Sequence, residues 1–171
     1  DPNKVIANFV TNRTDSPSGD TANALDGDDS TYVSYQNPVW IHTGDYVGVT
    51  YNKVISINNI RFLLGNGKNH FEASKLQYTM DGKEWQDLEL TGMDNAFTGV
   101  QGQYLDVVVE KGNLPENFEA MGIRLVATAD NKLDAYLNVH EIQINKGDDS
   151  QPGEVVGTYS CLLYTSDAAD D

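Results

Sequence analysis

The stretch 75–88 reads Lys-Leu-Gln-Tyr-Thr-Met-Asp-Gly-Lys-Glu-Trp-Gln-Asp-Leu, with the dipeptide Asp81-Gly82 between two strand-like runs. The run before the dipeptide alternates apolar and polar side chains, as a strand with one buried face does. Asp and Gly both tolerate positive φ, which tight hairpin turns demand. These residues predict a β-hairpin, and we expect the ring of Trp85, on the returning strand, to lie in the core.

Strand signals continue on both sides of this hairpin. Residues 46–51 and 55–64 precede it and are rich in β-branched and aromatic side chains. Long polar loops separate the apolar runs, and no segment offers an amphipathic helix longer than about two turns. This pattern predicts an all-β fold, an antiparallel β-sandwich. Further strands are expected at 104–110, 122–128 and 136–145.

The chain is strongly acidic, with 26 acidic residues against 11 basic ones and a formal net charge of −15. Six of the acids follow Gly147, whereas every Lys and Arg lies at or before Lys146. Nucleic acids and anionic membranes attract basic surfaces, so this charge argues against both partners. No apolar run is long enough for membrane insertion. A neutral ligand such as a sugar, or a cation, meets no such objection.

The composition changes after Lys146. Residues 1–146 suffice for one domain, and residues 147–159 are interpreted as a linker because they begin with Gly, Asp, Ser, Gln and Pro. Residues 160–171 are expected to be a disordered or artefactual tail, which leaves Cys161, the single cysteine, without a role. A body without cysteine excludes disulfides and thiolate metal sites. The first residues look like a cut inside a longer chain.

Four motifs occur in the order and spacing of one known family. Residues 24–31 read Ala-Leu-Asp-Gly-Asp-Asp-Ser-Thr, 45–51 read Asp-Tyr-Val-Gly-Val-Thr-Tyr, 78–85 carry the hairpin, and the closing runs are Ile123-Arg124-Leu125 and Glu141-Ile142-Gln143-Ile144. Together they resemble the discoidin, or coagulation factor 5/8 type C, superfamily. Within it the chain is similar to carbohydrate-binding module family 32, as found on bacterial family 84 β-N-acetylglucosaminidases and hyaluronidases. The resemblance implies a discoidin-like jelly roll over the domain 1–146, in which we expect Arg124 to pair with a carboxylate.

The resemblance also implies a structural calcium ion at the acidic loop, residues 26–31. This loop offers carboxylate and hydroxyl oxygens, the donors that Ca²⁺ takes, and neighbouring carboxylates favour a cation between them. In the family a carboxylate of the last strand completes the site. The expected set is Leu25, Asp26, Asp28, Thr31 and Glu141. The alternative is a solvated acidic turn. For Asp29, a position in solvent or a contribution of its carbonyl alone is an alternative to side-chain ligation.

Three polar loops carry chemistry suited to sugar recognition, in which an aromatic ring covers the apolar face of the sugar and polar groups contact its hydroxyls. The resemblance implies that these loops meet at one end of the sandwich. Galactose-binding members use an Arg near 64–66, which this chain lacks, so the expectation leans toward an N-acetylhexosamine such as GlcNAc. Each aromatic has the alternative of a place in the core. The expected ligand-binding residues are Tyr35, Trp40, His42, Asn66, Asn69, His70, Phe71 and Tyr136.

No constellation typical of catalysis stands out. A glycosidase needs two carboxylates across a cleft, and no such pair is recognisable here. We expect a non-catalytic, monomeric module that binds N-acetylhexosamine or galactose-type sugars on host or mucin glycans. It would hold a covalently tethered glycoside hydrolase on its substrate, in a secreted or cell-surface bacterial protein. The alternatives are a cell-adhesion or lipid-binding discoidin domain and a structural spacer of a larger extracellular enzyme.

Overall fold

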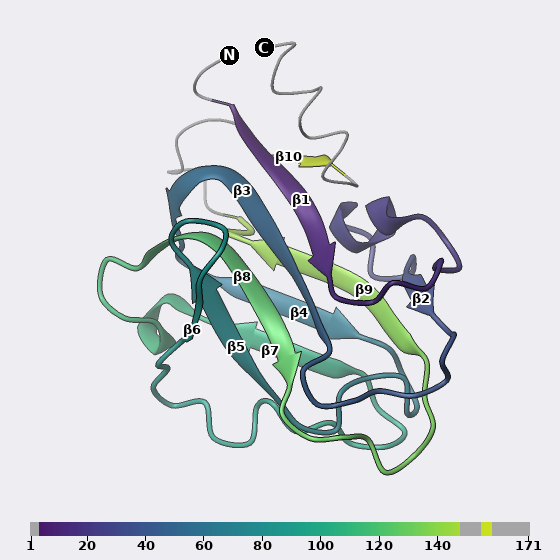
Figure 1. Ribbon diagram of the computed structural model, residues 1–171. Coiled ribbons are helices and arrows are strands. Elements are labelled where there is room, and N and C mark those ends of the chain that lie inside the picture. Colours follow the sequence, from purple (N-terminus) through teal and green to yellow (C-terminus); the bar gives the residue numbers. More distant parts are fainter. Residues whose placement is uncertain (1–3, 148–154, 159–171) are drawn as a thin grey trace.

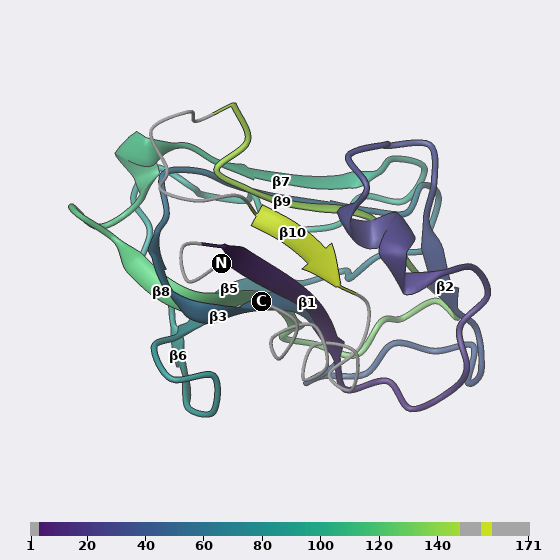
Figure 2. The same ribbon diagram turned by 90° about the horizontal axis from the view of Figure 1, so that it is seen from above.

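The computed structural model describes residues 4–147 and the backbone of residues 155–158. In this part of the chain two β-sheets face each other across a hydrophobic core, and two short 3₁₀ helices, η1 and η2, lie at the edges (Figures 1 and 2). The elements are β1 (Val5–Thr11), η1 (Thr21–Leu25), β2 (Val33–Tyr35), β3 (Tyr46–Ser56), β4 (Ile60–Leu64), β5 (Ser74–Thr79), β6 (Trp85–Asp87), β7 (Leu105–Val109), η2 (Lys111–Asn113), β8 (Glu119–Ala127), β9 (Leu137–Ile144) and β10 (Val155–Thr158).

The larger sheet has six strands in the order β10-β1-β3-β8-β5-β6. Its strands pair antiparallel, except that β10 lies parallel to β1 at the edge. Gly48 of β3 lies opposite Arg124 of β8, and a Cβ atom at position 48 would come within 2.4 Å of the Ile123 carbonyl oxygen. Only glycine permits this close approach of the two central strands.

The smaller sheet has four antiparallel strands in the order β2-β9-β4-β7. The register between β4 and β9 shifts by one residue, because Leu63 pairs with Glu141 and Leu64 pairs with Val139. Such a bulge re-aims side chains on the strand that carries the extra residue. The shift places His140 and Glu141 where they face η1 and the acidic loop rather than the core.

The strand pattern predicted from the sequence is confirmed for β3 to β9. Ile57, Phe62 and Leu125 are among the fully buried side chains that fill the space between the sheets. The sequence interpretation missed β1 and β2. The stretch 147–159, predicted as a linker, contains β10, which adds an edge strand to the larger sheet. The predicted tail 160–171, with Cys161, lies outside the described residues.

The predicted hairpin is confirmed, with Thr79 opposite Trp85, but its loop is longer than two residues. Asp81 closes that loop, since its carboxylate accepts the N–H groups of Lys83 at 2.8 Å and Glu84 at 2.9 Å. The expectation of a core position for Trp85 was wrong, because its half-buried ring lies 4.4 Å from the Arg124 guanidinium.

Among the residues that the structure describes, Arg124 pairs with no carboxylate, contrary to the expectation. Its guanidinium contacts two aromatic rings, because the Tyr46 ring lies 4.3 Å away in addition to that of Trp85. Its Nε donates to Gln77 Oε1 at 2.9 Å. Cation–π stacking on the solvent face of the sheet therefore replaces the expected ion pair.

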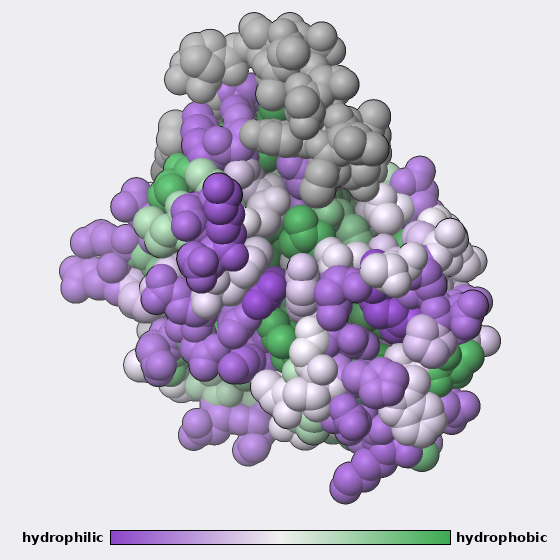
Figure 3. All heavy atoms as spheres, viewed as in Figure 1, coloured by the Kyte–Doolittle hydropathy of each residue, from purple (hydrophilic) through white to green (hydrophobic). Residues whose placement is uncertain are grey.

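The surface seen in Figure 3 is mainly hydrophilic, with small separate apolar spots. Within the described part of the chain, no helix has the length and apolar character needed to cross a membrane. Both faces of the molecule in Figure 2 are sheets, and the connections between strands gather at the two ends of the sandwich.

Candidate functional site

Four connections lie together at one end of the sandwich, the lower end in Figure 1, away from the beginning of β1. We call this region the loop end; it comprises residues 36–45, 65–73, 88–104 and 128–136. Three of these connections contain the loops in which the sequence predicted sugar contacts. Loops held by a rigid sheet scaffold are a frequent place for binding residues.

Asn131 joins three of these connections. Its backbone N–H donates to the Ile41 carbonyl at 3.0 Å, its side-chain amide donates to the His70 carbonyl at 2.9 Å, and its Oδ1 accepts the Glu72 N–H at 3.0 Å. Asn131 is 2% exposed. A buried amide with all of these bonds made fixes the loops in one arrangement. Sequence reasoning missed this role, since nothing local distinguishes Asn131 from other loop amides.

Two further pairs tie the loops together at the surface. The backbone N–H of Tyr136 donates to Asn69 Oδ1 at 3.0 Å. The carboxylate of Asp130 accepts both the N–H of Thr43, at 2.8 Å, and its hydroxyl, at 3.0 Å. Loops that are distant in sequence therefore form one continuous surface.

A cavity of about 450 Å³ opens on this surface. The connection 88–104, in which the sequence predicted no contacts, forms one wall. It is held in place by the Gly102 N–H, which donates to the Gly67 carbonyl at 2.8 Å, and by the Gly99 N–H, which donates to the Glu72 carbonyl at 3.0 Å. The cavity is lined by Lys68, His70, Glu72, Thr98, Gly99, Gln101, Lys132 and Leu133.

His70 lines this cavity with only one edge of its ring, because the residue is 1% exposed. Its Nδ1 lies 2.8 Å from the Gly65 carbonyl oxygen, so Nδ1 carries the proton and a neutral ring has Nε2 as an acceptor. The Nε2 edge packs against Gly99, where a Cβ atom would come within 2.4 Å of the ring. Gly99 thus leaves room for the imidazole beneath the cavity.

The other predicted sugar contacts have different surroundings. His42 and Asn66 are exposed, Tyr136 is 38% exposed, and Asn69 is half-buried. Trp40 is half-buried, and its carbonyl accepts from Arg13 Nη1 at 3.2 Å.

Tyr35 and Phe71 correct the sequence expectation, because both lie in the hydrophobic core. Phe71 is completely buried, so its ring offers no face to a ligand. Burial likewise raises the pKa of Tyr35 to about 12, while the Arg13 guanidinium lies 5.9 Å from the ring centre. These two aromatics anchor their loops from below, which was the alternative considered for each.

The acidic loop meets β9, as expected, through Asp26 and Glu141. The backbone N–H of Asp28 lies between the two carboxylates, 2.9 Å from Asp26 Oδ1 and 3.0 Å from Glu141 Oε1. Thr31 donates its hydroxyl to the Asp26 carboxylate, and this hydroxyl lies 3.1 Å from the Asp28 carbonyl oxygen. Two carboxylates, a hydroxyl and a carbonyl thus converge here.

The two carboxyl groups perturb each other's ionisation. Burial, and next the adjacent Asp26, raise the pKa of Glu141 to about 9. Burial acts to raise the pKa of Asp26 as well, but hydrogen bonds from Glu141 and Thr31 outweigh it and hold that pKa below its ordinary value. In the absence of a cation, the pair therefore shares one proton at neutral pH.

The remaining acids of this loop face elsewhere. The Asp28 carboxylate accepts from the N–H of Ser30 at 2.9 Å and from its hydroxyl at 2.6 Å. Asp29 forms a two-point ion pair with Arg61, at 2.9 and 3.0 Å. Within the described residues, no three His, Cys, Asp or Glu side chains form a cluster suited to a metal ion. A cation here would therefore need hydroxyl and backbone oxygens beside the carboxylates of Asp26 and Glu141, a mixture that suits Ca²⁺.

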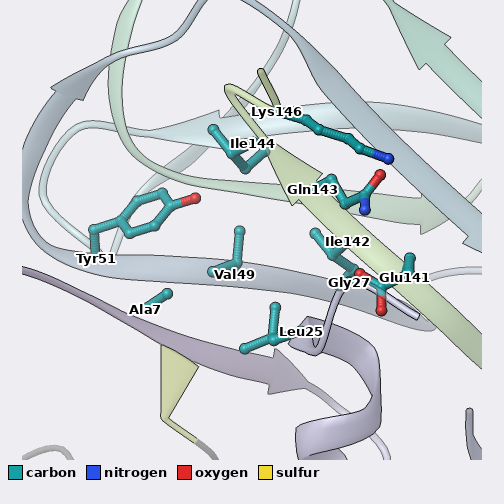
Figure 4. A pocket seen from close by; sticks show the side chains of 10 residues that line it. All are labelled: Ala7, Leu25, Gly27, Val49, Tyr51, Glu141, Ile142, Gln143, Ile144 and Lys146. Carbon is teal, nitrogen blue, oxygen red and sulfur yellow. The ribbon is translucent and has the colours of Figure 1, made fainter. Parts of the chain in front are cut away.

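A second cavity, of about 210 Å³, lies between the sheets beside the acidic loop (Figure 4). Apolar side chains from both sheets line it, together with Leu25 of η1, and Glu141 stands at its edge near Gly27. The ring of Tyr51 points into it, and burial raises the pKa of this phenol far above its ordinary value. This apolar wall is the reason why the Glu141 carboxyl is poorly solvated.

Comparison with known proteins gives one family match and many related folds. The sequence profile of the F5/8 type C domain matches residues 8–142. No curated protein sequence matches the chain. CBM32-1 from a family 31 glycoside hydrolase of Clostridium perfringens has the same fold, with a TM-score of 0.55 and 17% sequence identity over 85% of this chain and 94% of that one.

Two more solved structures of this fold were determined with sugars bound. CpGH89CBM32-5 from Clostridium perfringens, in complex with GalNAc-β-1,3-galactose, has a TM-score of 0.57 and 13% identity over 82% of this chain and 94% of that one. Chitosan-binding module 2 from a chitosanase/glucanase of Paenibacillus sp. IK-5 was solved in complex with chitotriose. It has a TM-score of 0.51 and 17% identity over 80% of this chain and 93% of that one.

Proposed function

The chain belongs to the F5/8 type C domain family, and from this premise we propose that it is a non-catalytic carbohydrate-binding module whose sugar site is the loop end. The observation that carries the proposal is the convergence of three loops on Asn131, beside a cavity of about 450 Å³. The cavity walls combine an apolar side chain, Leu133, with several hydrogen-bonding groups, which is the composition of a small-ligand site.

The fold relatives support this choice of ligand class. One of them was solved with GalNAc-β-1,3-galactose and another with chitotriose, so related domains take both N-acetylhexosamine–galactose and amino-sugar ligands. We propose N-acetylhexosamine or galactose-type sugars for this chain. Tyr136 and Trp40 would supply the aromatic surface, and exposed Asn66 and His42, with half-buried Asn69, would supply polar groups at the same end.

Titration of the ¹⁵N-labelled chain with GlcNAc, GalNAc and galactose tests this proposal. We expect amide signals of the loop end to shift, with a dissociation constant on the order of 1 mM, because one monosaccharide buries little surface. Signals of the turn of the β5–β6 hairpin, residues 80–84, at the opposite end, serve as the internal control. The absence of shifts with all three sugars would contradict the proposed site and favour a spacer role.

We propose further that the acidic loop and β9 hold a structural calcium ion. Asp26 and Glu141 would contribute carboxylates, Thr31 its hydroxyl, and Leu25 and Asp28 backbone oxygens. When bound, the ion would replace the proton that the two carboxyl groups otherwise share, and it would link residues 113 positions apart. The ion would thus stabilise the fold rather than contact the sugar, because the acidic loop is not among the connections that form the loop end.

We propose that the module belongs to a secreted or cell-surface bacterial protein and is covalently tethered to a glycoside hydrolase, in which it acts as a monomer. Family 31 and family 89 glycoside hydrolases carry the similar modules named above, and a family 84 parent is our proposal from the sequence motifs. Tethering raises the local concentration of substrate around the catalytic domain, so even weak sugar binding is useful.

A further inference from the structure

We propose that Asn66 is a site of spontaneous covalent modification, at which the side-chain amide becomes a carboxylate and the isoaspartate product lengthens the backbone by one atom. The sequence contains a single Asn-Gly dipeptide, Asn66-Gly67. It forms part of a turn in the connection between β4 and β5. The reactants are these two residues, hydroxide and water, so the modification requires neither an enzyme nor a cofactor.

The Asn66 side chain already lies against the backbone nitrogen that would attack it. Asn66 Oδ1 accepts the N–H of Gly67 at 2.8 Å. The carbonyl carbon Cγ is about 1.2 Å from Oδ1, so it lies within about 4 Å of this nitrogen. Reacting atoms about 3–3.5 Å apart are in a near-attack arrangement, and rotation of an exposed side chain supplies the remaining movement.

Little else restrains the reacting groups in the part of the chain that the structure describes. Within residues 4–147 the amide nitrogen Nδ2 of Asn66 makes no hydrogen bond, so it can leave as ammonia without breaking one. A Cβ atom at Gly67 would meet no atom within 4 Å. The Gly67 nitrogen is therefore open to approach, and a residue without a side chain hinders that approach least.

The reaction balances without an oxidant or a reductant. Hydroxide removes the amide proton of Gly67, and the nitrogen attacks Asn66 Cγ to close a five-membered succinimide ring. The Cγ–Nδ2 bond breaks, and Nδ2 takes a proton from water and leaves as ammonia. Water then opens the ring. Cleavage of the bond between nitrogen and Cγ gives aspartate, and cleavage of the bond to the backbone carbonyl carbon gives isoaspartate, whose chain runs through Cβ and Cγ.

Other asparagines of the chain lack this combination of features. Asn95 and Asn117 are exposed and have φ values of 64° and 56°, but a residue with a side chain follows each of them. At buried Asn131, hydrogen bonds hold both ends of the side-chain amide. We therefore expect Asn66 to react first.

The consequence for sugar binding rests on the proposed function. The Asn66 carbonyl oxygen accepts the N–H of Asn69 at 3.2 Å, and Asn69 Oδ1 accepts the N–H of Tyr136 at 3.0 Å. On the other side, the Gly67 carbonyl oxygen accepts the N–H of Gly102 at 2.8 Å. An extra backbone atom between these contacts would displace Asn69 and so release Tyr136. The modified chain should therefore bind sugar more weakly.

Incubation of the full chain at pH 6 and at pH 8 tests the modification. Peptide mapping by mass spectrometry should find a gain of about 1 Da at Asn66 before any gain at Asn95 or Asn117. The gain should be faster at pH 8, because the attacking species is the deprotonated amide. The chain in denaturant shows the reaction without the fold. A gain at Asn66 in denaturant but not in the folded chain would overturn the proposal.

Two variants locate the reaction. Asn66→Gln keeps an amide but requires a larger ring, and Gly67→Ala adds a Cβ atom beside the attacking nitrogen, so both should gain mass at residue 66 much more slowly. Gly44→Ala is the matched control for Gly67→Ala, because both glycines have positive φ, 94° and 71°, and open space at the Cβ position. It should react like the parent chain. A gain in Asn66→Gln as fast as in the parent chain would overturn the proposed chemistry.

NMR titration with GlcNAc before and after incubation measures the consequence. The affinity of the parent chain should fall about three- to tenfold as isoaspartate accumulates, whereas that of Asn66→Gln should stay at its starting value. Modification without this fall would overturn the link to the sugar site. A parent chain that binds no sugar before incubation would contradict the proposed function alone, whereas sugar binding without any gain in mass at Asn66 would overturn the inference alone.

Discussion

The loop end and the acidic loop are held together by different forces. At the loop end, neutral side chains such as Asn131 satisfy backbone groups of neighbouring loops, so the surface is complete without a ligand. In the acidic loop, Asp26 and Glu141 bring two carboxylates together beside an apolar cavity. A shared proton or a bound cation is needed to remove the repulsion between two negative charges at these positions. The comparison teaches that one site is preorganised by hydrogen bonds, while the other depends on what it binds.

The largest expected effect is on the free energy of unfolding, when the hydrogen bonds that Asn131 makes between the loops are removed. Asn131→Ala removes the partners of the Glu72 N–H and the His70 carbonyl, and should lower the free energy of unfolding by about 3 kcal/mol. Denaturant unfolding measures the loss. Asn66→Ala is the control, because within the described residues the exposed Asn66 side chain makes one hydrogen bond, with the N–H of its neighbour Gly67, and the change should alter stability by less than about 0.5 kcal/mol. Equal stability of the two variants would refute the role given to Asn131.

Calcium is expected to stabilise the acidic loop. At a concentration about 100 times the dissociation constant, a bound ion adds about 2.7 kcal/mol to the free energy of unfolding. Thermal unfolding with calcium and with a chelator measures this gain. Glu141→Gln should abolish it, whereas Asp28→Asn should largely keep it, because the Asp28 carboxylate faces Ser30. An unchanged melting temperature in calcium would remove the ion from the proposal.

The dependence of stability on pH separates the two regions further. The folded state raises the pKa of Glu141 from 4.5 to about 9, so it binds a proton that the unfolded chain releases. This contribution is present below pH 4.5 and is lost as pH rises toward 9. A tenfold change in proton affinity corresponds to about 1.4 kcal/mol. Asp26 does not offset the loss, because its lowered pKa keeps this carboxyl ionised in both states over that range. We therefore expect metal-free protein to lose at least about 2 kcal/mol of stability between pH 4.5 and 9.

Glu141→Gln is the control for the pH experiment, because it removes the titrating group. Its stability should change less between pH 5 and 9 than that of the parent chain. Carboxyls with lowered pKa, such as Asp15 and Asp29, are ionised in both states over this range. A parent chain that becomes more stable from pH 5 to 9 without metal would contradict the shared proton.

The smallest effect concerns the exposed aromatic surface. Tyr136→Ala should weaken sugar binding about three- to tenfold, with little change in stability, because the ring is 38% exposed. Tyr32→Ala is the matched control, since Tyr32 is 44% exposed and stacks on His140 beside the acidic loop. NMR titration with GlcNAc measures both. Equal weakening by the two changes would refute a site restricted to the loop end.

Much of the fold could be predicted because strand signals are local. The alternation of side-chain types in 46–51 predicts a strand, and Asp81-Gly82 predicts a hairpin turn. Each signal lies within a few residues. The short strand β2 was missed, because three residues carry too little periodicity to distinguish a strand from a loop. Trp85 was misplaced for another reason, since β6 lies at a sheet edge, where Arg124 of β8, two strands away in the same sheet, covers its ring.

The candidate site could be predicted only as a set of loops. Their residue types indicated which connections carry polar and aromatic groups, and the structure brings these connections together. Which residues face the cavity could not be foreseen. Phe71 and Lys68 stand three positions apart, yet one fills the core and the other lines the opening. The wall around Gly99 contains Phe97 and Gln101, but no motif in the sequence distinguishes this connection from other loops.

By itself the sequence determined the all-β class, the order of most strands, the hairpin and the acidic loop, because these depend on neighbours along the chain. Tertiary structure alone decided that Asn131 joins three loops, that Glu141 stands beside an apolar cavity and that Lys68 and Lys132 share a cavity. Burial and charge proximity depend on contacts between residues that are 60 or more positions apart along the chain. No local pattern encodes those contacts, because they exist only when the sheets have packed.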